Sequence, residues 1–327
     1  MTAGVSQTDG MSDAVPLRDA WTAALYGTDG FFLREAPADH FRTSATASSV
    51  FAEAVAELAL RCDVEAIWDI GAGRGELLRG LARVNPGWRL HGVEVAPRPA
   101  DLHRSISWHS GMPSDVSGLV IANELLDDVP CSIAEVDDAE VVRYVMVEPA
   151  TGRETLGEPL DAHDAAWVEQ WWPGAAAGER VEVGRDRDEA WRDVVSGVAT
   201  GLAIAIDFGH ERGARPRYGS LRSYRSGRVA DLTWDGSADV TADVALDSVA
   251  AACAGQVLRQ RDVLHQLGVD GARPDPQRAV SDPIGYVRDL ARAGEAAELT
   301  ASPGLGDFGW VVSEIGGVRA SLHAGRA

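Results

Sequence analysis

The 327-residue sequence contains no lysine, and all 30 of its basic residues are arginine. This absence excludes a Walker-type lysine at a phosphate site and a lysine that forms a Schiff base. Cysteine is also scarce. Cys62, Cys131 and Cys253 lie far apart, and no Cys-x-x-Cys pair occurs. This spacing argues against a disulfide framework or a thiolate zinc site, and it fits a reducing cytosol.

Excess positive charge and long apolar runs are lacking as well. The net charge of −20 repels nucleic acids and anionic membranes and favours a basic partner, although acidity can equally serve solubility alone. No run approaches the ~20 apolar residues of a membrane span. Residues 1–16 lack the pattern of a signal peptide, and we expect them to form a disordered tail. These features predict a cytoplasmic protein that binds neither nucleic acid nor membrane.

A glycine-rich turn is the most informative feature that is present. An apolar strand ends at Asp69 and runs into a turn with Gly71, Gly73 and Gly75. Glycines let a backbone approach a ligand closely, and the helix after the turn offers free N–H groups. Glu94 follows the next strand, where its carboxylate can accept hydrogen bonds from a ribose. The pattern predicts a nucleoside cofactor, and its Gly-x-Gly-x-Gly spacing resembles the first motif of class I S-adenosylmethionine methyltransferases.

Strands and helices alternate along much of the chain, which predicts an α/β fold with a doubly wound parallel sheet and helices on both faces. Ligands bind such a sheet beyond the carboxyl ends of its strands, where Asp69, Glu94, Asn123 and Glu124 fall. The predicted strands are Ala66–Ile70, Arg89–Val95, Ile106–His109, Gly118–Glu124, Leu202–His210 and Phe308–Ile315.

The alternation of strands and helices is interrupted between Pro130 and Val183. This predicts an inserted α+β region that lies over the sheet as a lid or substrate-binding part. We therefore expect a helical N-terminal cap at 17–62 and a cofactor-binding core at 63–129. The insertion would occupy 130–185, and the rest of the core would occupy 186–327.

Three polar side chains after the predicted strands are candidates for catalysis. Glu124 and Asp127 follow the fourth strand, three residues apart, and His210 ends the fifth. A histidine there could act as a general base, since its unperturbed pKa is about 6.5. Structural alternatives are that Asp127 caps a turn and that Glu124 and His210 are solvated loop residues. No His, Asp or Glu cluster has metal-ligand spacing, so we expect no metal.

Several segments together resemble the MidA-like methyltransferases, a family whose mitochondrial member assists assembly of respiratory complex I by methylating an arginine. The resemblance spans about Tyr26 to Ile315. Its markers are the segments His40–Ser44, Asp69–Glu76, Asn123–Pro130, Asp207–His210, Gly219–Arg222, Asp239–Val244 and Leu264–Gly268.

The resemblance implies a class I methyltransferase that binds S-adenosyl-L-methionine and methylates a protein arginine. Gly71, Gly73 and Gly75 would then admit the methionine part of the cofactor, and Glu94 would bind the ribose. The third strand, with Trp108, would border the adenine. At the reacting end, Asn123 would lie beside the cofactor, and Glu124 and Asp127 would clamp a guanidinium while His210 accepts a proton. Two alternatives stay open, namely a small-molecule O- or N-methyltransferase and a non-catalytic cofactor-binding assembly factor. The oligomeric state is also open.

Overall fold

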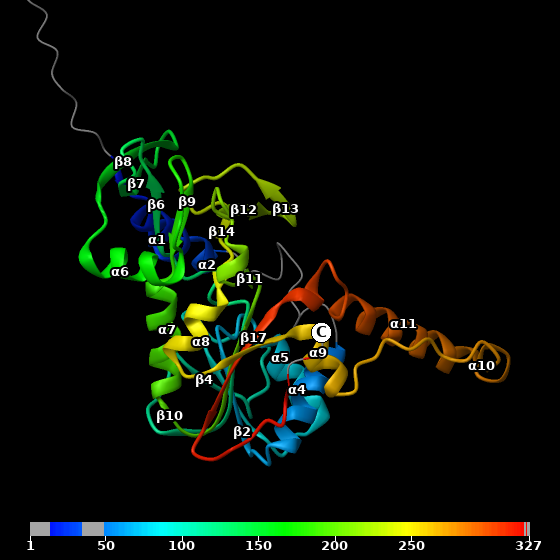
Figure 1. Cartoon of the computed structure of the whole chain (residues 1–327). Helices are drawn as coiled ribbons and strands as arrows, with labels where there is room; N and C mark the ends of the chain where they lie inside the picture. The colour runs from blue at the N-terminus through cyan, green and yellow to red at the C-terminus, as the bar shows by residue number, and fades with distance from the viewer. Residues whose placement is uncertain (1–13, 35–48, 324, 326–327) are drawn as a thin grey trace, which may run out of the picture.

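The computed structural model of the protein describes residues 14–34, 49–323 and 325. The strands of its largest sheet are β2 (Ala66–Ile70), β3 (Arg89–Val93), β4 (Ser107–His109), β5 (Val116–Asn123), β10 (Val198–Asp207), β16 (Gln256–Arg259) and β17 (Gly309–Ile315). Their spatial order is β16-β17-β10-β5-β2-β3-β4 (Figure 1). The five strands from β4 to β10 are parallel, whereas β17 is antiparallel to both of its neighbours. The order reverses between β2 and β5, which is where open parallel sheets bind ligands.

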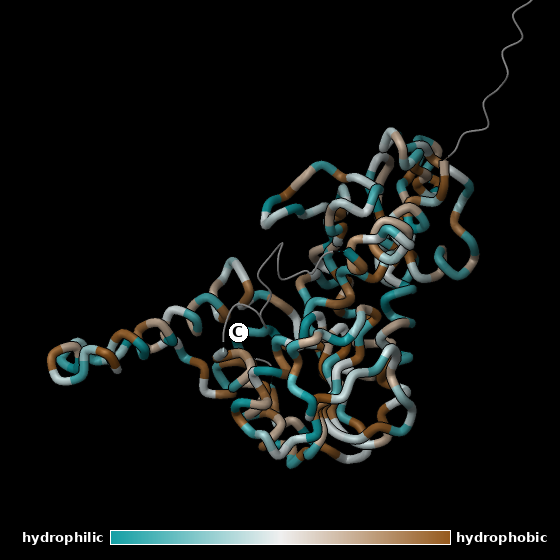
Figure 2. Tube along the Cα trace, turned by 180° about the vertical axis from the view of Figure 1, so that it is seen from behind, coloured by the Kyte–Doolittle hydropathy of each residue, from teal (hydrophilic) through white to brown (hydrophobic). Residues whose placement is uncertain are grey.

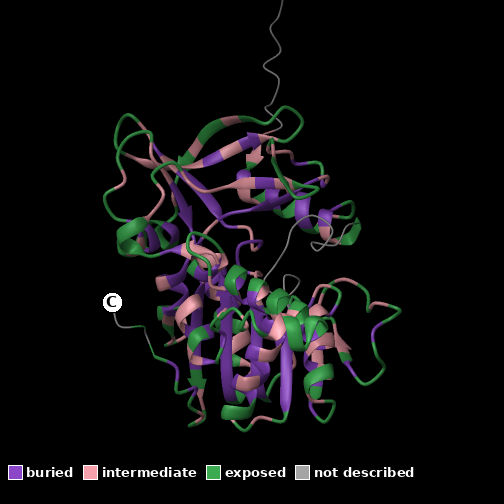
Figure 3. Ribbon diagram, turned by 90° about the vertical axis from the view of Figure 1, so that its right-hand side faces the viewer, coloured by how far each residue is buried: buried purple, intermediate pink, exposed green. Residues whose placement is uncertain are grey.

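Helices cover both faces of this sheet. One face carries α4 (Ser49–Arg61), α5 (Glu76–Val84), α9 (Gln260–Gln266) and part of α11 (Pro283–Leu299), and the other carries α7 (Arg185–Ser196) and α8 (Leu246–Ala252). Successive strand residues point to opposite faces. Accordingly, Ile67 and Leu119 belong to the first core, and their neighbours Trp68 and Val120 belong to the second. Figure 3 shows the buried strands between helices whose outer sides are exposed.

A second layer lies above the main sheet in the view of Figure 1. Its larger sheet has the order β1-β7-β6-β9, with β8 paired to β7, and its smaller sheet has the order β13-β12-β14. The side chains of Leu17 and Trp21 from α1 fill a core with Ile133 and Val240 from the two sheets. The elements of this layer are β1 (Val15–Pro16), α1 (Leu17–Tyr26), α2 (Phe31–Arg34), β6 (Ser132–Val136), β7 (Val142–Glu148), β8 (Arg153–Pro159), α6 (Ala162–Trp171), β9 (Arg180–Val183), β12 (Arg222–Arg225), β13 (Arg228–Ala230) and β14 (Asp239–Thr241).

The prediction of a mixed α/β fold with an additional α+β part is confirmed at this level, and β2 has the predicted bounds. The second layer is larger than the predicted insertion, because β12, β13 and β14 join it from much later in the chain. Val15 and Pro16 pair with β7, so the predicted disorder is wrong for these two residues. The marker His40–Ser44 lies outside the described residues.

The last helices form an arm that projects from the main body. It consists of α10 (Arg278–Ser281) and the first half of α11, and it carries alternating hydrophobic and hydrophilic segments (Figures 1 and 2). Only the second half of α11 packs on the core, through Ala296 and Leu299. Within the described ranges, no helix is both long enough and apolar enough to cross a lipid bilayer.

Candidate functional site

A cavity of about 900 Å³ lies at the carboxyl ends of β2, β3 and β5. Residues from the turns after these strands form one part of its wall, and residues of the N-terminal cap form another. The cavity therefore occupies the position that the reversal of strand order predicts for a ligand. The cap residues in its wall are Tyr26, Phe32, Leu33 and Arg34.

The glycine turn forms one end of this cavity. Gly71, Gly73 and Gly75 have φ angles of +70°, +54° and +80°, a region that side chains other than glycine rarely adopt. A Cβ atom on Gly71 would lie 2.7 Å from Leu125 Cδ1, and one on Gly75 would lie 2.9 Å from Leu102 Cδ1. Gly71 and Gly73 line the cavity, so the backbone of the turn is open to a ligand there. This cradle fits the methionine part of S-adenosylmethionine.

Glu94 lines the cavity beside the glycine turn. Its carboxylate accepts hydrogen bonds from the backbone amides of Gly73 and Ala96, both at 3.0 Å. These two bonds fix the carboxylate between the turns after β2 and β3, where a ribose can reach it. Asp69 also lines the cavity, and it is almost fully buried. Burial, together with the nearby Glu76 and Glu94, raises the pKa of Asp69 well above its usual value.

Trp108 is placed differently from the prediction, because it does not line the cavity. Its ring packs against Gly92, where a Cβ would lie 2.6 Å from it, and its indole N–H donates to the carbonyl oxygen of Ala96 at 3.2 Å. It therefore supports the turn after β3 from behind. Val95 and Ser110 form that part of the cavity wall instead.

Asn123 and Glu124, at the end of β5, both line the cavity as predicted. The Asn123 side-chain amide donates to Glu124 Oε1 at 3.1 Å, while the buried Asn123 Oδ1 has no hydrogen-bond partner among the described residues. Glu124 adopts a φ of +54°, and its backbone N–H donates to the carbonyl oxygen of Ile206 at 2.8 Å. A positive φ is a strained backbone conformation for glutamate, and such strained residues cluster at functional sites.

Asp127 does not line the cavity, so its predicted position beside the acceptor is wrong. Asp127 is 2% exposed and accepts a hydrogen bond from Thr241 Oγ1 at 2.6 Å. Its backbone N–H donates to Asp207 Oδ2 at 3.2 Å. Burial raises the pKa of Asp127, and the bond from Thr241 partly opposes this. The residue thus joins β14 to the turn after β5, which is neither the predicted role in catalysis nor a turn cap.

His210 is likewise not part of the cavity wall. The chain leaves the main sheet after Asp207, and His210 lies in β11 (Gly209–His210), which pairs with β15 (Val244–Ala245). Arg215 donates to His210 Nδ1 at 2.8 Å, and the ring of Trp172 meets the imidazole edge-on at 5.2 Å. Burial and the charge of Arg215 lower the pKa of His210 to about 4. A proton acceptor for this cavity must therefore be another group.

Asp128, which the sequence analysis did not single out, lines the cavity where Asp127 was expected. It is 5% exposed, and its buried Oδ1 has no hydrogen-bond partner among the described residues. Asp239, which is fully buried, is a neighbouring acidic side chain whose charge acts on Asp128. Burial raises the pKa of Asp128 well above its usual range, and burial together with Asp127 raises the pKa of Asp239 to about 8. Two neighbouring carboxyl groups in a buried place each disfavour the charged form of the other.

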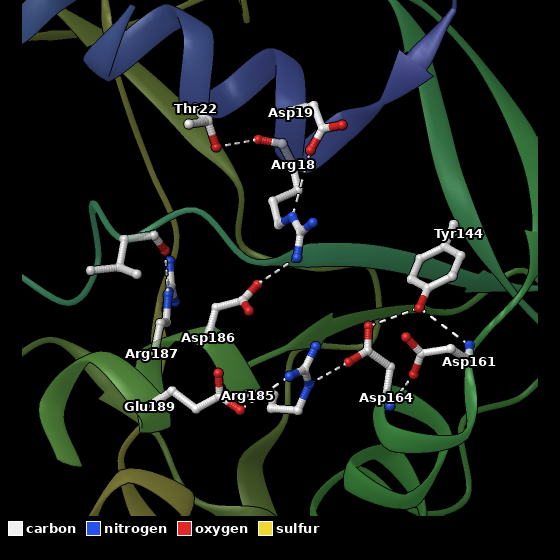
Figure 4. Close-up of polar contacts among 11 residues, drawn as sticks. Arg18, Asp19, Thr22, Tyr144, Asp161, Asp164, Arg185, Asp186, Arg187 and Glu189 are labelled. Carbon is white, nitrogen blue, oxygen red and sulfur yellow. Dashed lines mark hydrogen bonds and ion pairs between the residues drawn. The ribbon is translucent and has the colours of Figure 1, made fainter. Parts of the chain in front are cut away.

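Arg187 holds the segments around Asp128 together, and the sequence analysis missed it too. Its guanidinium donates to the carbonyl oxygens of Asp127 at 2.7 Å and Val129 at 2.9 Å, on either side of Asp128. It also donates to the carbonyl oxygens of Ala242 at 3.1 Å and Asp243 at 2.9 Å. Figure 4 shows Arg187 beside Arg18 and Asp186, which form an ion pair of 3.1 Å between α1 and α7.

Comparisons with known proteins agree with this geometry. A family model described as “Putative S-adenosyl-L-methionine-dependent methyltransferase” matches residues 81–262, more than half of the chain. A crystal structure of a Burkholderia thailandensis protein bound to S-adenosyl-homocysteine is 22% identical, with a TM-score of 0.76, covering 95% of this chain and 89% of that one. A native crystal structure from the same species is 20% identical, with a TM-score of 0.74 and the same coverage. No curated protein matches the chain. The resemblance to the MidA-like family is thereby confirmed.

Proposed function

Because the chain belongs to this family of S-adenosyl-L-methionine-dependent methyltransferases, we propose that it methylates the guanidinium group of a protein arginine. The observation that carries the proposal is Glu124, which has a strained backbone conformation and lines the cofactor cavity at the end of β5. The acceptor would be a basic or arginine-bearing protein, which also suits the net charge of −20.

The cofactor end of the cavity can be assigned to particular residues. The backbone of the glycine turn would hold the methionine part, and Glu94 would accept hydrogen bonds from the ribose hydroxyls. When bound, S-adenosylmethionine supplies a methyl group on a positively charged sulfur. Asn123 Oδ1, which is buried without a partner among the described residues, offers an acceptor between this end and Glu124. Since the methyl donor is already activated, the residues mainly position and desolvate the reactants.

The acceptor end must hold a second positive charge close to the first. Two unit charges 4 Å apart repel by about 4 kcal/mol at a protein surface, so a carboxylate is needed to offset this. Glu124 is fixed by its bond from Asn123 and can orient a guanidinium by charge-assisted hydrogen bonds. In the transfer, an acceptor nitrogen forms a bond to the methyl carbon, the electron pair of the broken bond remains on sulfur, and one N–H proton leaves. With His210 outside the cavity, a cavity carboxylate is the acceptor for that proton.

The test compares cofactor binding with turnover. Calorimetry should show that S-adenosylmethionine binds with micromolar or tighter affinity and that NAD does not bind. Lysate proteins incubated with a labelled methyl donor are then examined by mass spectrometry for methylated arginine. Label found only on a small molecule would favour the small-molecule alternative. Binding without any transfer would favour the assembly factor.

Glu124→Gln tests the residue that carries the proposal. Methyl transfer should fall by roughly a hundredfold or more, which is the cost of losing one charged group in the transition state, while cofactor affinity barely changes. The matched control is Glu65→Gln, because the Glu65 side chain is 84% exposed beyond the opposite end of β2. Full activity in Glu124→Gln would remove this carboxylate from the mechanism.

A further inference from the structure

The cavity has an aromatic wall that the proposed function does not use. Tyr26, at the end of α1, and Phe32, in α2, both line the cavity that also contains Glu124 and Asp128. The two rings lie 5.3 Å apart between their centroids and are inclined by 33°. Tyr26 is 38% exposed, so part of its ring is open to a ligand.

This wall is rigidly supported by the N-terminal cap. Phe32 meets the fully buried Phe31 edge-on, with 5.4 Å between ring centroids, and Phe31 belongs to the core of the second layer. The Tyr26 hydroxyl donates to the backbone carbonyl oxygen of Asp128 at 3.1 Å. The position of Tyr26 is therefore fixed relative to Asp128, and the aromatic and acidic parts of the wall form one unit.

The acidic part of the wall points to a ligand independently. Asp128 is more than nine-tenths buried, lines the cavity, and has an Oδ1 atom without a hydrogen-bond partner among the described residues. Both oxygens of the neighbouring, fully buried Asp239 also have no hydrogen-bond partner among the described residues. The nearby cation Arg187 directs its hydrogen bonds to backbone carbonyl oxygens. Buried carboxyl oxygens beside the cavity wall are therefore left without a donor from the described residues, which is rare in a folded protein unless a ligand or water supplies one.

We propose that Tyr26, Phe32, Glu124 and Asp128 form an acceptor box that selects a positively charged, planar group such as guanidinium over a neutral group of the same shape. The carboxyl groups bind its N–H groups, and the aromatic faces bind its charge through cation–π contacts. The inference rests on the proposed function and deepens it, because it assigns acceptor selection to the N-terminal cap.

The experiment uses two small probes of the same shape and different charge. The full-length protein, saturated with S-adenosyl-homocysteine, is titrated with propylguanidinium and with propylurea, and chemical shifts are followed by NMR. Propylguanidinium should bind at least tenfold more tightly. Asp128→Asn should weaken it tenfold or more, and Tyr26→Leu and Phe32→Leu should each weaken it several-fold. Propylurea binding should be unaffected in all three variants.

Control variants separate the box from general effects. Tyr26→Phe loses only the hydroxyl and should keep the preference for the charged probe, which shows that the ring carries it. Tyr218→Leu and Asp138→Asn, at exposed positions away from the cavity, should bind both probes as the unchanged protein does. Unchanged binding of S-adenosyl-homocysteine in every variant would show that the cavity remains folded.

Equal binding of the two probes would overturn the acceptor box, as would a preference that survives Asp128→Asn, Tyr26→Leu and Phe32→Leu. Failure of the proposed function gives different results. If S-adenosyl-homocysteine does not bind, the same titrations without it still decide the box. If the charged probe is selected but no arginine is methylated in lysate, the box stands and the arginine substrate does not.

Discussion

Replacing Arg187 with methionine should destabilise the protein severely. Arg187 is 1% exposed, and its guanidinium donates four hydrogen bonds of 2.7–3.1 Å to backbone carbonyl oxygens in two separate segments. It also lies 5.5 Å from the ring centre of Trp21 in α1. Methionine is unbranched like arginine but has no donor. The change would therefore leave the carbonyl oxygens of Val129, Ala242 and Asp243 without these bonds, and the buried carboxyl groups without their neighbouring cation.

The size of the effect follows from these contacts. One hydrogen bond to a charged group contributes about 1.5–3 kcal/mol, but four bonds from one cation are not additive. Removing one partner from a buried charged network typically costs about 3–5 kcal/mol. We therefore expect a loss of about 4 kcal/mol, a large part of the 5–15 kcal/mol that stabilises a typical protein. For a protein of this size, the unfolding temperature should fall by roughly 6 °C.

Thermal unfolding followed by near-ultraviolet circular dichroism measures this shift through the tryptophan environments. Arg192→Met is the matched control, because Arg192 lies in the same helix, is 50% exposed, and makes one ion pair of 3.9 Å with Glu189. Its unfolding temperature should stay within about 2 °C of the unchanged protein. If Arg187→Met also stayed within 2 °C, the view that this guanidinium ties the two segments together would be refuted.

Three further predictions concern the cofactor end and the histidine. Gly73→Val should abolish binding of S-adenosyl-homocysteine in calorimetry, and normal binding would place the turn outside the site. The variant should lose only about 1–2 kcal/mol of stability, because the φ of +54° is strained for valine but the nearest atom to an added Cβ is Glu76 Oε2 at 3.4 Å. Glu94→Gln should weaken binding of S-adenosyl-homocysteine by roughly 1.5–3 kcal/mol, and unaltered affinity would exclude hydrogen bonds from the ribose hydroxyls to this carboxylate. The pKa of His210 is about 4 in the folded protein and about 6.5 in the unfolded chain. As the pH drops from about 6.5 to 4, the unfolded chain binds a proton that the folded protein does not, so the free energy of unfolding should fall by at most about 3 kcal/mol. Urea unfolding at several pH values should show that His210→Gln removes this part of the pH dependence, and an unchanged slope would contradict the assigned cause.

The cofactor end of the site was determined by the local sequence. The turn after β2 needs glycines for its positive φ angles. Glu94 follows β3, which is parallel to β2, so it lies at the same edge of the sheet as that turn. These are properties of neighbouring residues, since a strand, a turn and a helix in succession fix where the backbone amides point. The bounds Ala66–Ile70 were predictable for the same reason.

The acceptor end was decided by contacts between distant parts of the chain. Asp127 and Asp128 are adjacent, and the sequence does not show which one enters the cavity. Thr241 and Arg187 bind Asp127 from 114 and 60 residues away and turn Asp128 outward. Local periodicity cannot predict such hydrogen bonds, because they form only when the second layer has folded.

Two other misplacements have the same origin. The predicted fifth strand continued through His210, but the chain leaves the main sheet after Asp207 to pair with β15, which comes later in the sequence. Trp108 lies at the predicted strand end, but the register of β4 with β3 sets it against Gly92. A shift of one residue reverses which side of a strand faces a ligand. The sequence alone thus determined the fold type and the cofactor end of the cavity, whereas strand register and buried hydrogen bonds decided which side chains complete the site.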